Sequence, residues 1–523
     1  MMLLRNGVCA LVVGVLCVAA FRAPAAGATA RGTVFEDRDG DGRRDPSEPG
    51  VAGVAVSNER DVVLTDEDGR YEMEVAARAI IFVTKPAGYA VPLSAQNLPR
   101  FYYIHRPDGE PGLHYPGVEA TGPLPEAIDF PLTRIEERKR FEIVAFADPQ
   151  PQTKQEVLYL QEDVLGELVR KPYAFGVCLG DIMFDDLSLF PLYNDSIARL
   201  GFPFYNVAGN HDINFDAASD AESTATFVRF FGPANYSWSV GDVHFVAMDN
   251  ILYKGRGYDG RPYHEGFDEA SLEWLRNDLA RVPPRKLLVL CTHAPIQFSL
   301  DEEHRLCLRA EGLFEVLRDR REILALSGHT HLTFQHRFTA ADGWNGGGEF
   351  RQVNCVTASG AWWSGPPDDR GVPAALQYDG TPNGYTIVSF DGAAYQVRYK
   401  AAGYAPGLQM HIFPPGRHEN GPAPERTVLA NVFYGTPDSR VAFRLDDGPF
   451  LPMERTPQRD PLAIRHYGDS SRQGKDWIRP RLTEHIWQAM LPEKLPPGTH
   501  AITVQAEVGG RTVQDAVVFL AGQ

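Results

Sequence analysis

Between residues 141 and 331, five short apolar runs each end directly in residues of the kinds that bind metal ions. Runs of this length alternate with longer amphipathic stretches, such as Glu156 to Val169 and Ala270 to Ala280, which is typical of buried strands alternating with helices. Because the carboxyl ends of strands in an α/β fold converge on one crevice, we expect the side chains after these runs to meet at one site. The pairs are Ile143 to Ala147 before Asp148-Pro149-Gln150, Phe175 to Leu179 before Gly180-Asp181, Phe204 to Ala208 before Gly209-Asn210-His211-Asp212, Leu287 to Cys291 before Thr292-His293, and Ile323 to Leu326 before Ser327-Gly328-His329-Thr330-His331.

The residue types in these loops indicate what the site would bind. Asp, Asn and His offer oxygen and nitrogen donors of intermediate hardness, which suit zinc, manganese, iron and similar ions. Two such ions about 3.5–4 Å apart can hold a bridging hydroxide and clamp the attacking and leaving oxygens of a displacement at phosphorus. A single Asp or Asn after a strand is more often a cap or turn residue, so the prediction depends on the whole ordered set. Gly180, Gly209 and Gly328 are expected to let the backbone turn sharply.

The order Gly-Asp, Gly-Asn-His-Asp, Thr-His, Gly-His-Thr-His, each behind a predicted strand, resembles the calcineurin-like metallophosphoesterase superfamily over about residues 141 to 336. The resemblance implies a layered α/β domain, two divalent metal ions and hydrolysis of phosphate esters. It implies that His211 stabilises or protonates the leaving oxygen, with Asp185 or Asp212 orienting it. The ligand set that it implies is Asp148 and His331 for the first metal, Asn210, His293 and His329 for the second, and Asp181 as the bridge between them.

One position departs from the family pattern. The first motif of the family usually reads Asp-x-His, and here it reads Asp148-Pro149-Gln150. An amide oxygen is a neutral and weaker ligand than imidazole, so Gln150 as a ligand predicts a first metal that is held less tightly or is harder, such as manganese or magnesium. The identity of the two ions (Mn, Zn, Fe or Mg) therefore stays open.

A chain of 523 residues is too long for one hydrophobic core, and its texture predicts four segments. Short alternating runs and turn signals predict an N-terminal β-sandwich module at 31–134. The metallophosphoesterase domain is predicted at 135–400, and short strand-like runs predict a C-terminal β-sandwich domain at 401–523. The stretch from Trp362 to Tyr385, with the β-rich tail, resembles the C-terminal part of bacterial relatives built on this three-part plan. Packing is the expected use of the pair Trp362-Trp363.

Residues 1–30 are predicted to be a signal peptide. Arg5 supplies the positive charge, Val8 to Phe21 the apolar stretch, and Ala26-Gly27-Ala28 or Ala28-Thr29-Ala30 the cleavage site. A secreted or periplasmic protein follows from this prediction. Beyond that segment no apolar run is long enough for a membrane span. The formal net charge of −17 argues against a nucleic-acid-binding patch, so a phosphorylated small molecule or a phosphodiester is the expected partner.

An acidic loop near the N-terminus matches the calcium-loop pattern D-x-D-x-D-G-x5-E. Closely spaced carboxylates can wrap one hard cation, and the neighbouring sequence resembles the calcium-binding B-type modules of bacterial surface adhesins over about residues 31 to 85. A solvated acidic turn without an ion explains the same residues, and the choice stays open. The candidate calcium ligands are Asp37, Asp39, Asp41, Asp45 and Glu48.

Together these observations predict a secreted metal-dependent phosphoesterase that hydrolyses phosphate monoesters or diesters by a metal-bound hydroxide at a binuclear site. The alternative is a surface-binding or adhesive β-module protein in which the metal site is vestigial. Retention of almost the whole ligand set favours the enzyme. The sequence does not choose between monoester, diester and pyrophosphate, because loops outside the motifs, such as Asn250 to Asp268 and Ser299 to Glu311, set that preference.

Overall fold

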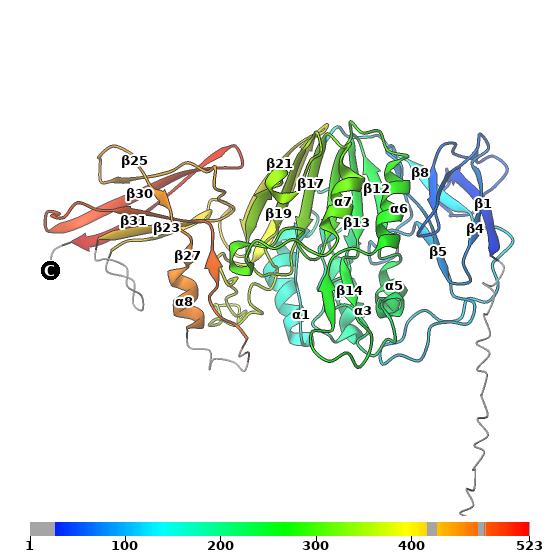
Figure 1. The fold of residues 1–523 in the computed structure, drawn as a ribbon, viewed down its shortest axis with the longest axis horizontal. Coiled ribbons are helices and arrows are strands. Elements are labelled where there is room, and N and C mark those ends of the chain that lie inside the picture. Colours follow the sequence, from blue (N-terminus) through cyan, green and yellow to red (C-terminus); the bar gives the residue numbers. More distant parts are fainter. Residues whose placement is uncertain (1–26, 416–425, 469–474, 476, 522–523) are drawn as a thin grey trace, which may run out of the picture.

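The computed structural model describes residues 27–415, 426–468, 475 and 477–521. Three bodies follow one another along the long axis in chain order: a β-sandwich, a layered domain of sheets and helices, and a second β-sandwich (Figure 1). Of the predicted signal peptide, residues 1–26 lie outside the described part, and the first strand begins at Ala28. Within the described part, no helix combines the length and apolarity needed to cross a bilayer.

The N-terminal module is built from two four-stranded sheets, ordered β4-β1-β8-β6 and β3-β2-β5-β7. In β4 exposed and buried residues alternate, so Tyr71, Met73 and Val75 enter the core between the sheets while the polar residues face water. The strands are β1 (Ala28–Glu36), β2 (Ala55–Ser57), β3 (Val62–Leu64), β4 (Arg70–Val75), β5 (Ala79–Val83), β6 (Tyr89–Ala90), β7 (Tyr102–His105) and β8 (Phe130–Arg134).

The central domain contains two sheets, which form the layers of the predicted α/β domain. The first has the order β11-β10-β9-β20-β21, with β9, β10 and β11 parallel and β20 antiparallel to β9. Residues Ile143 to Phe146 of β9 are all buried, because other layers cover both faces of this sheet. Its strands are β9 (Arg140–Phe146), β10 (Phe175–Cys178), β11 (Phe204–Asn206), β20 (Gly384–Asp391) and β21 (Ala394–Ala401).

The second sheet of the central domain has the order β12-β13-β16-β17-β19-β18. Strands β13, β16, β17 and β19 are parallel, and an antiparallel strand closes each edge. Its strands are β12 (Tyr236–Val240), β13 (Val243–Met248), β16 (Leu287–Thr292), β17 (Glu322–Ser327), β18 (Phe334–Arg337) and β19 (Glu349–Asn354), and a separate hairpin, β14 (Ile251–Tyr253) and β15 (Tyr263–Glu265), lies after β13.

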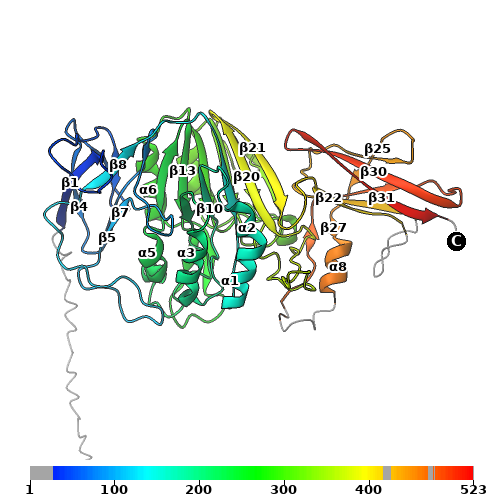
Figure 2. The same cartoon turned by 180° about the vertical axis from the view of Figure 1, so that it is seen from behind.

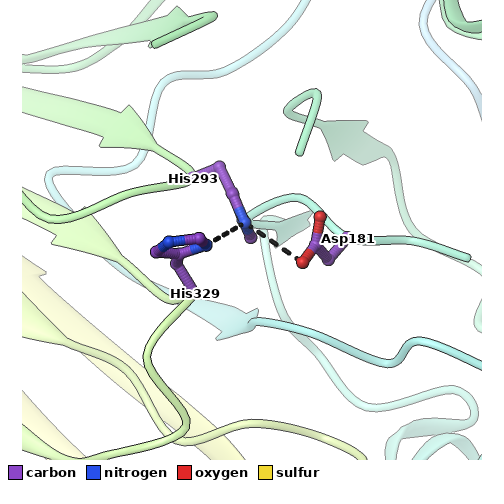
Figure 3. A group of neighbouring side chains, drawn as sticks. All are labelled: Asp181, His293 and His329. Carbon is purple, nitrogen blue, oxygen red and sulfur yellow. Dashed lines mark hydrogen bonds and ion pairs between the residues drawn. The ribbon is translucent and has the colours of Figure 1, made fainter. Parts of the chain in front are cut away.

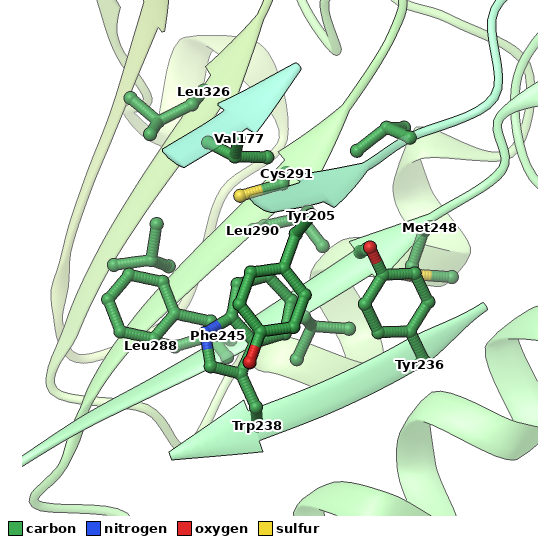
Figure 4. Close-up of a cluster of buried hydrophobic side chains, with 14 of the residues drawn as sticks. Val177, Tyr205, Tyr236, Trp238, Phe245, Met248, Leu288, Leu290, Cys291 and Leu326 are labelled. Carbon is green, nitrogen blue, oxygen red and sulfur yellow. The ribbon is translucent and has the colours of Figure 1, made fainter. Parts of the chain in front are cut away.

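Large side chains fill the space between the two sheets (Figure 4). Tyr205 of β11 and Trp238 of β12 stack almost parallel, with ring centroids 4.1 Å apart, and Phe245 stacks on the other side of Trp238. Helices cover the outer faces of the sheets, with α6 and α7 on one side (Figure 1) and α1, α2 and α3 on the other (Figure 2). The helices are α1 (Lys154–Leu160), a π-helical turn (Gln161–Leu165), α2 (Gly166–Leu168), α3 (Phe190–Ile197), α4 (Asp220–Ser223), α5 (Ala225–Phe231), α6 (Glu269–Leu279) and α7 (Ala310–Leu317).

The C-terminal domain is a second sandwich, with the sheets β22-β23-β29-β26 and β25-β24-β30-β31. The pair β27-β28 and helix α8 lie between this sandwich and the central domain (Figures 1 and 2). The elements are β22 (Met410–Phe413), β23 (Thr427–Val432), β24 (Val441–Leu445), β25 (Leu451–Pro452), β26 (Glu454–Arg455), β27 (Gln458–Arg459), α8 (Pro461–Tyr467), β28 (Leu482–Thr483), β29 (Ile486–Met490), β30 (Gly498–Val508) and β31 (Arg511–Ala521).

A fully buried polar network joins the C-terminal domain to the central domain. His485 lies between Asp379 (Nε2 to Oδ2, 3.2 Å) and Asn431 (Nδ1 to Oδ1, 2.6 Å), and the Thr333 hydroxyl donates to Asp379 at 2.9 Å. Such groups are costly to bury unless they are paired, so they fix the two domains in one arrangement. The predicted fold class, a layered α/β domain flanked by two all-β domains, is confirmed.

Candidate metal centre

The predicted site residues come from loops at the carboxyl ends of strands in both central sheets. Asp148 follows β9, Asp181 follows β10 and Asn210 follows β11, all in the five-stranded sheet. His293 follows β16, and the loop with His329 and His331 follows β17, both in the six-stranded sheet. The site therefore lies where the carboxyl ends of the two sheets meet.

Asp181, His293 and His329 form the centre of the group, and their ligand atoms all lie within 4.8 Å of one another (Figure 3). His293 Nε2 is 3.2 Å from Asp181 Oδ2 and 3.0 Å from His329 Nδ1. Asn210 joins them, with its Oδ1 atom 3.1 Å from the same His293 nitrogen. Four of the predicted ligands therefore converge on one point.

The remaining predicted ligands lie on the other side of Asp181. His331 Nε2 is 3.8 Å from Asp148 Oδ1. Gln150 lies between the two carboxylates, and its amide nitrogen donates to Asp181 Oδ2 and, at 3.5 Å, to Asp148 Oδ1. All of these side chains are buried. Asp181 thus contacts both halves of the set, as the resemblance implies for a bridging ligand.

Each imidazole is oriented by a hydrogen bond on the nitrogen that faces away from the group. His293 Nδ1 bonds to the carbonyl of Leu179 at 2.9 Å, and His331 Nδ1 to the carbonyl of Gly360 at 2.6 Å. His329 Nε2 bonds to the carboxylate of Glu265 at 3.1 Å. Such outer partners fix the tautomer and the ring direction of a ligand histidine, so each ring presents one lone pair to the centre.

The backbone under the ligands adopts a conformation that these residue types seldom take. Left-handed φ angles of 38–74° occur at Asp148, Gln150, Asp181, His329 and His331. Such angles cost free energy and cluster at functional sites, where the surrounding structure imposes them.

All three motif glycines are required by close approach, since a Cβ atom on Gly209 would lie 2.1 Å from the backbone nitrogen of Asp181. A Cβ atom on Gly180 would lie 2.5 Å from His293 Nδ1, and one on Gly328 would lie 2.4 Å from Asp148 Oδ2. Of the three motif glycines, only Gly180 has a positive φ, so only there does the backbone also adopt a conformation that favours glycine.

His211 lies beside the ligands and is held by two carboxylates. Its backbone N–H donates to Asp181 Oδ1 at 2.8 Å, and its Nδ1 atom is 2.6 Å from Asp185 Oδ1. Asp212, the other candidate partner, instead accepts three backbone N–H groups, from Ile182, Met183 and Gly209, at 2.9–3.1 Å. Asp185 therefore orients the imidazole, while Asp212 holds the loops together.

The group is buried, and its carboxylates and imidazoles shift one another's pKa values. Burial raises the pKa of Asp148 to about 8. Burial also opposes ionisation of Asp181, but the His293 and His211 imidazoles outweigh it and lower that pKa. Burial lowers the pKa of His293, but the Asp181 and Asp148 carboxylates raise it by more, so that it reaches about 10. Because a ligand imidazole must be neutral, cation binding here is coupled to proton release.

The side chains fit two divalent metal ions. Two carboxylates, one amide and three imidazoles form the donor set that ions of intermediate hardness prefer. Gln150 supplies a further indication, because among the described residues its buried Oε1 atom has no hydrogen-bond partner. A half-turn of the amide exchanges oxygen and nitrogen, which brings this oxygen to the point between the two carboxylates.

Two residues that support the ligands lie outside the motifs, and the sequence patterns do not predict them. Glu265 ends β15 in the hairpin after β13, where it contacts His329 and pairs with Arg261 and Arg305. Asn250 clamps the turn after His293, since its amide exchanges two hydrogen bonds with the backbone of Ala294, at 2.8 and 3.0 Å. Both lie in the segment 250–268, which the sequence analysis marks only as a loop outside the motifs that would set substrate preference.

The acidic loop of the N-terminal module is more compact than its pattern suggests. Ligand atoms of Asp37, Asp39 and Glu48 lie within 4.8 Å of one another, whereas Asp41 and Asp45 are not part of that group. The Asp45 carboxylate accepts from the backbone and hydroxyl of Ser47, at 2.6 and 2.7 Å. The predicted five-carboxylate calcium site is thus reduced to three carboxylates in this structure.

Comparison with known proteins gives three family matches in chain order. Residues 38–114 match the N terminal of Calcineurin-like phosphoesterase, residues 141–332 match Calcineurin-like phosphoesterase, and residues 352–509 match the C terminal of Calcineurin-like phosphoesterase. The central match contains every predicted ligand, from Asp148 to His331.

A curated relative, the "Probable glycerophosphodiester phosphodiesterase GpdQ" of Arcobacter nitrofigilis, is 26% identical over 147 residues, which cover 27% of this chain and 50% of the relative. The chain thus spans about half the length of that relative. Among solved structures, a dimetal phosphatase from Danio rerio aligns at 15% identity and a TM-score of 0.31, over 49% of this chain and 98% of that one. The purple acid phosphatase PPD1 from yellow lupin (Lupinus luteus) seeds aligns at 11% identity and a TM-score of 0.34, over 66% and 67% of the two chains.

Proposed function

Because this chain belongs to the calcineurin-like phosphoesterases, in a form with N-terminal, central and C-terminal parts, we propose that it hydrolyses phosphate monoesters or diesters with two divalent metal ions. The observation that carries the proposal is the convergence of six predicted ligands from two sheets on one buried site, with His211 beside them. The alternative, an adhesive protein with a vestigial site, is disfavoured because a site out of use has no reason to keep buried, mutually repelling groups.

The ligands divide between the two ions as the family pattern implies. Asp148 and His331, with Gln150 after a half-turn of its amide, would hold the first ion, and Asn210, His293 and His329 the second, with Asp181 shared. When bound, two such ions supply Lewis-acid polarisation of the phosphoryl group and activation of a water molecule. The identity of the ions is open among Mn, Zn, Fe and Mg, and the neutral Gln150 favours a harder ion at the first position.

His211 is proposed to act on the leaving group. Burial lowers its pKa, but the carboxylates of Asp181 and Asp185 outweigh this and raise the pKa, which favours the protonated imidazole that a general acid needs. Asp185 occupies Nδ1, which leaves Nε2 to donate the proton to the departing oxygen. Asp181 fixes the backbone of His211, so the same carboxylate positions both the proposed metal centre and the proposed acid.

The test is turnover of 4-nitrophenyl phosphate and of its bis-ester by the full chain, with Mn, Zn, Fe or Mg added and with chelator, beside elemental analysis of the purified protein. We expect about two ions per chain and turnover that chelator removes and metal restores. Turnover that survives complete removal of metal, or no turnover of either ester with any of the four ions, would contradict the proposal.

We also propose that the chain is exported and cleaved near Ala28. The pattern of residues 1–30 supports this. Ala28, Thr29 and Ala30 pair with β4 (Ala28 with Val75), so a cut before or after Ala28 would leave β1 nearly whole, whereas a cut after Ala30 would remove three paired residues. The intact mass of the protein from the culture medium or periplasm checks this. A mass that retains residues 1–26 would contradict it.

A further inference from the structure

Aromatic rings lead from His211 to the surface. Phe184 stacks on the His211 imidazole, with centroids 4.3 Å apart and planes 20° apart. Trp477 stacks on Phe184 in turn, at 6.0 Å and 19°. Each ring is thus tilted by only about 20° from the next, and the last of them, Trp477, is 43% exposed. His211, Phe184 and Trp477 thus form an aromatic ramp, which runs from the proposed acid to the solvent.

Trp362 closes one side of this ramp. Its ring meets Phe184 at 83° and Trp477 at 85°, with centroid distances of 6.0 and 5.7 Å. Trp362 also stacks on the proposed ligand His331, at 4.4 Å and 26°. Unlike Trp477, Trp362 is buried, so it forms a wall, and the accessible aromatic surface belongs to the ramp.

Trp477 reaches this place from the C-terminal domain, and ties to the central domain hold it there on both sides. Before it, Lys475 Nζ lies 3.0 Å from Glu156 Oε1 and 2.9 Å from the carbonyl of Trp362. After it, the Arg481 backbone donates to Tyr378 at 3.1 Å. The Lys475 and Glu156 side chains are only 12% and 13% exposed, so water screens this pair little. The chain thus fixes an exposed tryptophan beside the site at the cost of a largely buried ion pair.

We propose that the exposed ring of Trp477, supported by Phe184, binds the leaving group of the substrate, and that this leaving group carries a planar aromatic ring, as a nucleoside does. The inference rests on the proposed function, because it is the leaving oxygen at His211 that places the rest of the leaving group beside the ramp. A single exposed aromatic residue needs no explanation. Here three rings stack from the proposed acid outward, and a distant segment of the chain holds the outermost one. The fold therefore maintains this aromatic surface.

Stacking is the chemistry that such a surface offers. An aromatic side chain binds any base through its π face, without reading its hydrogen-bonding edge, and each stacked base contributes substantially to affinity. The chain carries a formal net charge of −17, which disfavours a long polyanion and favours a small nucleotide. The expected substrates are therefore nucleoside phosphates or their small diesters.

The test compares adenosine 5′-monophosphate with ribose 5-phosphate, which lose their phosphate from the same kind of primary alcohol and differ in the base. The methyl diesters of both form a second pair. Wild type is compared with Trp477→Ala, with Trp477→Phe, and with Phe450→Ala, which removes another exposed aromatic side chain from the C-terminal domain. We expect wild type to prefer the adenosine compound by about 10-fold or more in kcat/KM, and Trp477→Ala to lose the preference mainly through KM.

The controls separate stacking from general damage. Trp477→Phe should keep most of the preference and Phe450→Ala all of it, and Trp477→Ala should lower kcat/KM for ribose 5-phosphate by much less than for adenosine 5′-monophosphate. Equal kcat/KM for the two members of a pair in wild type, or an equal loss for both in Trp477→Ala, would overturn the inference while leaving the proposed function intact.

Binding decides the matter where hydrolysis fails. If neither these esters nor 4-nitrophenyl esters are hydrolysed with any metal, the proposed function is wrong. Calorimetry with adenosine and with ribose then tests the ramp alone. Adenosine binding that Trp477→Ala abolishes supports the aromatic site, and no difference between adenosine and ribose overturns it.

Discussion

Two groups of candidate metal ligands occur among the described residues, and they differ in how far apart their members lie in the sequence. In the N-terminal loop the three clustered carboxylates come from one stretch, Asp37 to Glu48. In the central domain the proposed ligands run from Asp148 to His331 and come from two sheets. Acidic residues of one loop can lie close together because they stabilise a turn. Residues from several distant loops come together only when the whole domain folds.

Their hydrogen bonds show the same difference. In the loop, Asp37 accepts from the backbone of Gly40 and Gly42 at 2.8 and 3.1 Å, and Glu48 accepts from Arg38 and Asp45, so neighbouring amides satisfy the charges. In the centre the side chains face one another, and Gln150 Oε1 lacks a partner among the described residues. Acidic residues that lie close together are therefore weak evidence for a metal site. Buried polar atoms that converge from distant segments are stronger evidence.

The strongest test of this contrast removes a ligand from the central group. Asp181→Asn or His293→Ala is expected to lower turnover by far more than the about 10- to 100-fold that loss of an outer partner costs, because both halves of the site lose charge or geometry. Turnover, bound metal and circular dichroism of the purified variants are the measurements. A folded variant with turnover close to wild type would remove these residues from the site.

His211→Ala should come next in size, with a loss of about 10²–10⁴-fold in turnover. Both metals should stay bound, since His211 faces Asp185 and the leaving group. The loss should grow with the basicity of the leaving alcohol, which rates across a graded series of aryl and alkyl esters measure. A variant that binds one metal fewer would make His211 a ligand, and an equal loss for every ester would argue against proton donation.

Glu265→Gln tests the carboxylate that orients His329 and lies outside every motif. We expect a loss of about 10- to 100-fold in metal affinity or activity. Removing the charge weakens the bond that orients His329. Titration of metal into the stripped protein, followed by activity, measures it. Glu273→Gln on helix α6 is the matched control, because Glu273 pairs only with Arg60 at the surface, at 3.4 Å. Equal metal affinity in both variants would show that Glu265 is dispensable.

The smallest effect is expected at the acidic loop. Calcium at ten times its dissociation constant would stabilise the loop by about 1.4 kcal/mol, and so slow trypsin cleavage after the exposed Arg43 and Arg44 about 10-fold. The experiment uses the full chain with calcium, magnesium or chelator, and Asp39→Asn as the variant without response. Identical cleavage rates in calcium and in chelator would show that the loop is a turn that does not bind calcium, in contrast to the central site.

The central site was predictable because each ligand follows an apolar run that had to be a buried strand, as His293 follows β16. The same logic could not find Glu265 or Trp477, which depend on where a hairpin and a distant segment fold back. Nor could it choose between Asp185 and Asp212, since both lie close to His211 in the chain or in the fold and only the loop geometry separates them.

The layout of the sheets was predictable only in part. Alternating strands and helices announce a layered α/β domain, but the pattern does not reveal that β9 to β11 and β16 to β17 belong to different sheets. Strand β20 illustrates this, because it joins the first sheet from a distant part of the chain by antiparallel pairing with β9. Long-range antiparallel pairing leaves no local signature in either segment.

The pairing of β9 with β20 also sets the order of events during synthesis. Strand β9, which carries Asp148, remains unpaired on one side until Gly384–Asp391 has been made, and the carbonyl of Asp148 waits for the Ser359 hydroxyl, which donates to it at 2.7 Å. Closing so long a loop comes late, because its entropy is lost before any contact compensates for it. With the export proposed above, we therefore expect the metal pocket to be completed only after synthesis, so that the chain selects its ions from those of the compartment in which it folds.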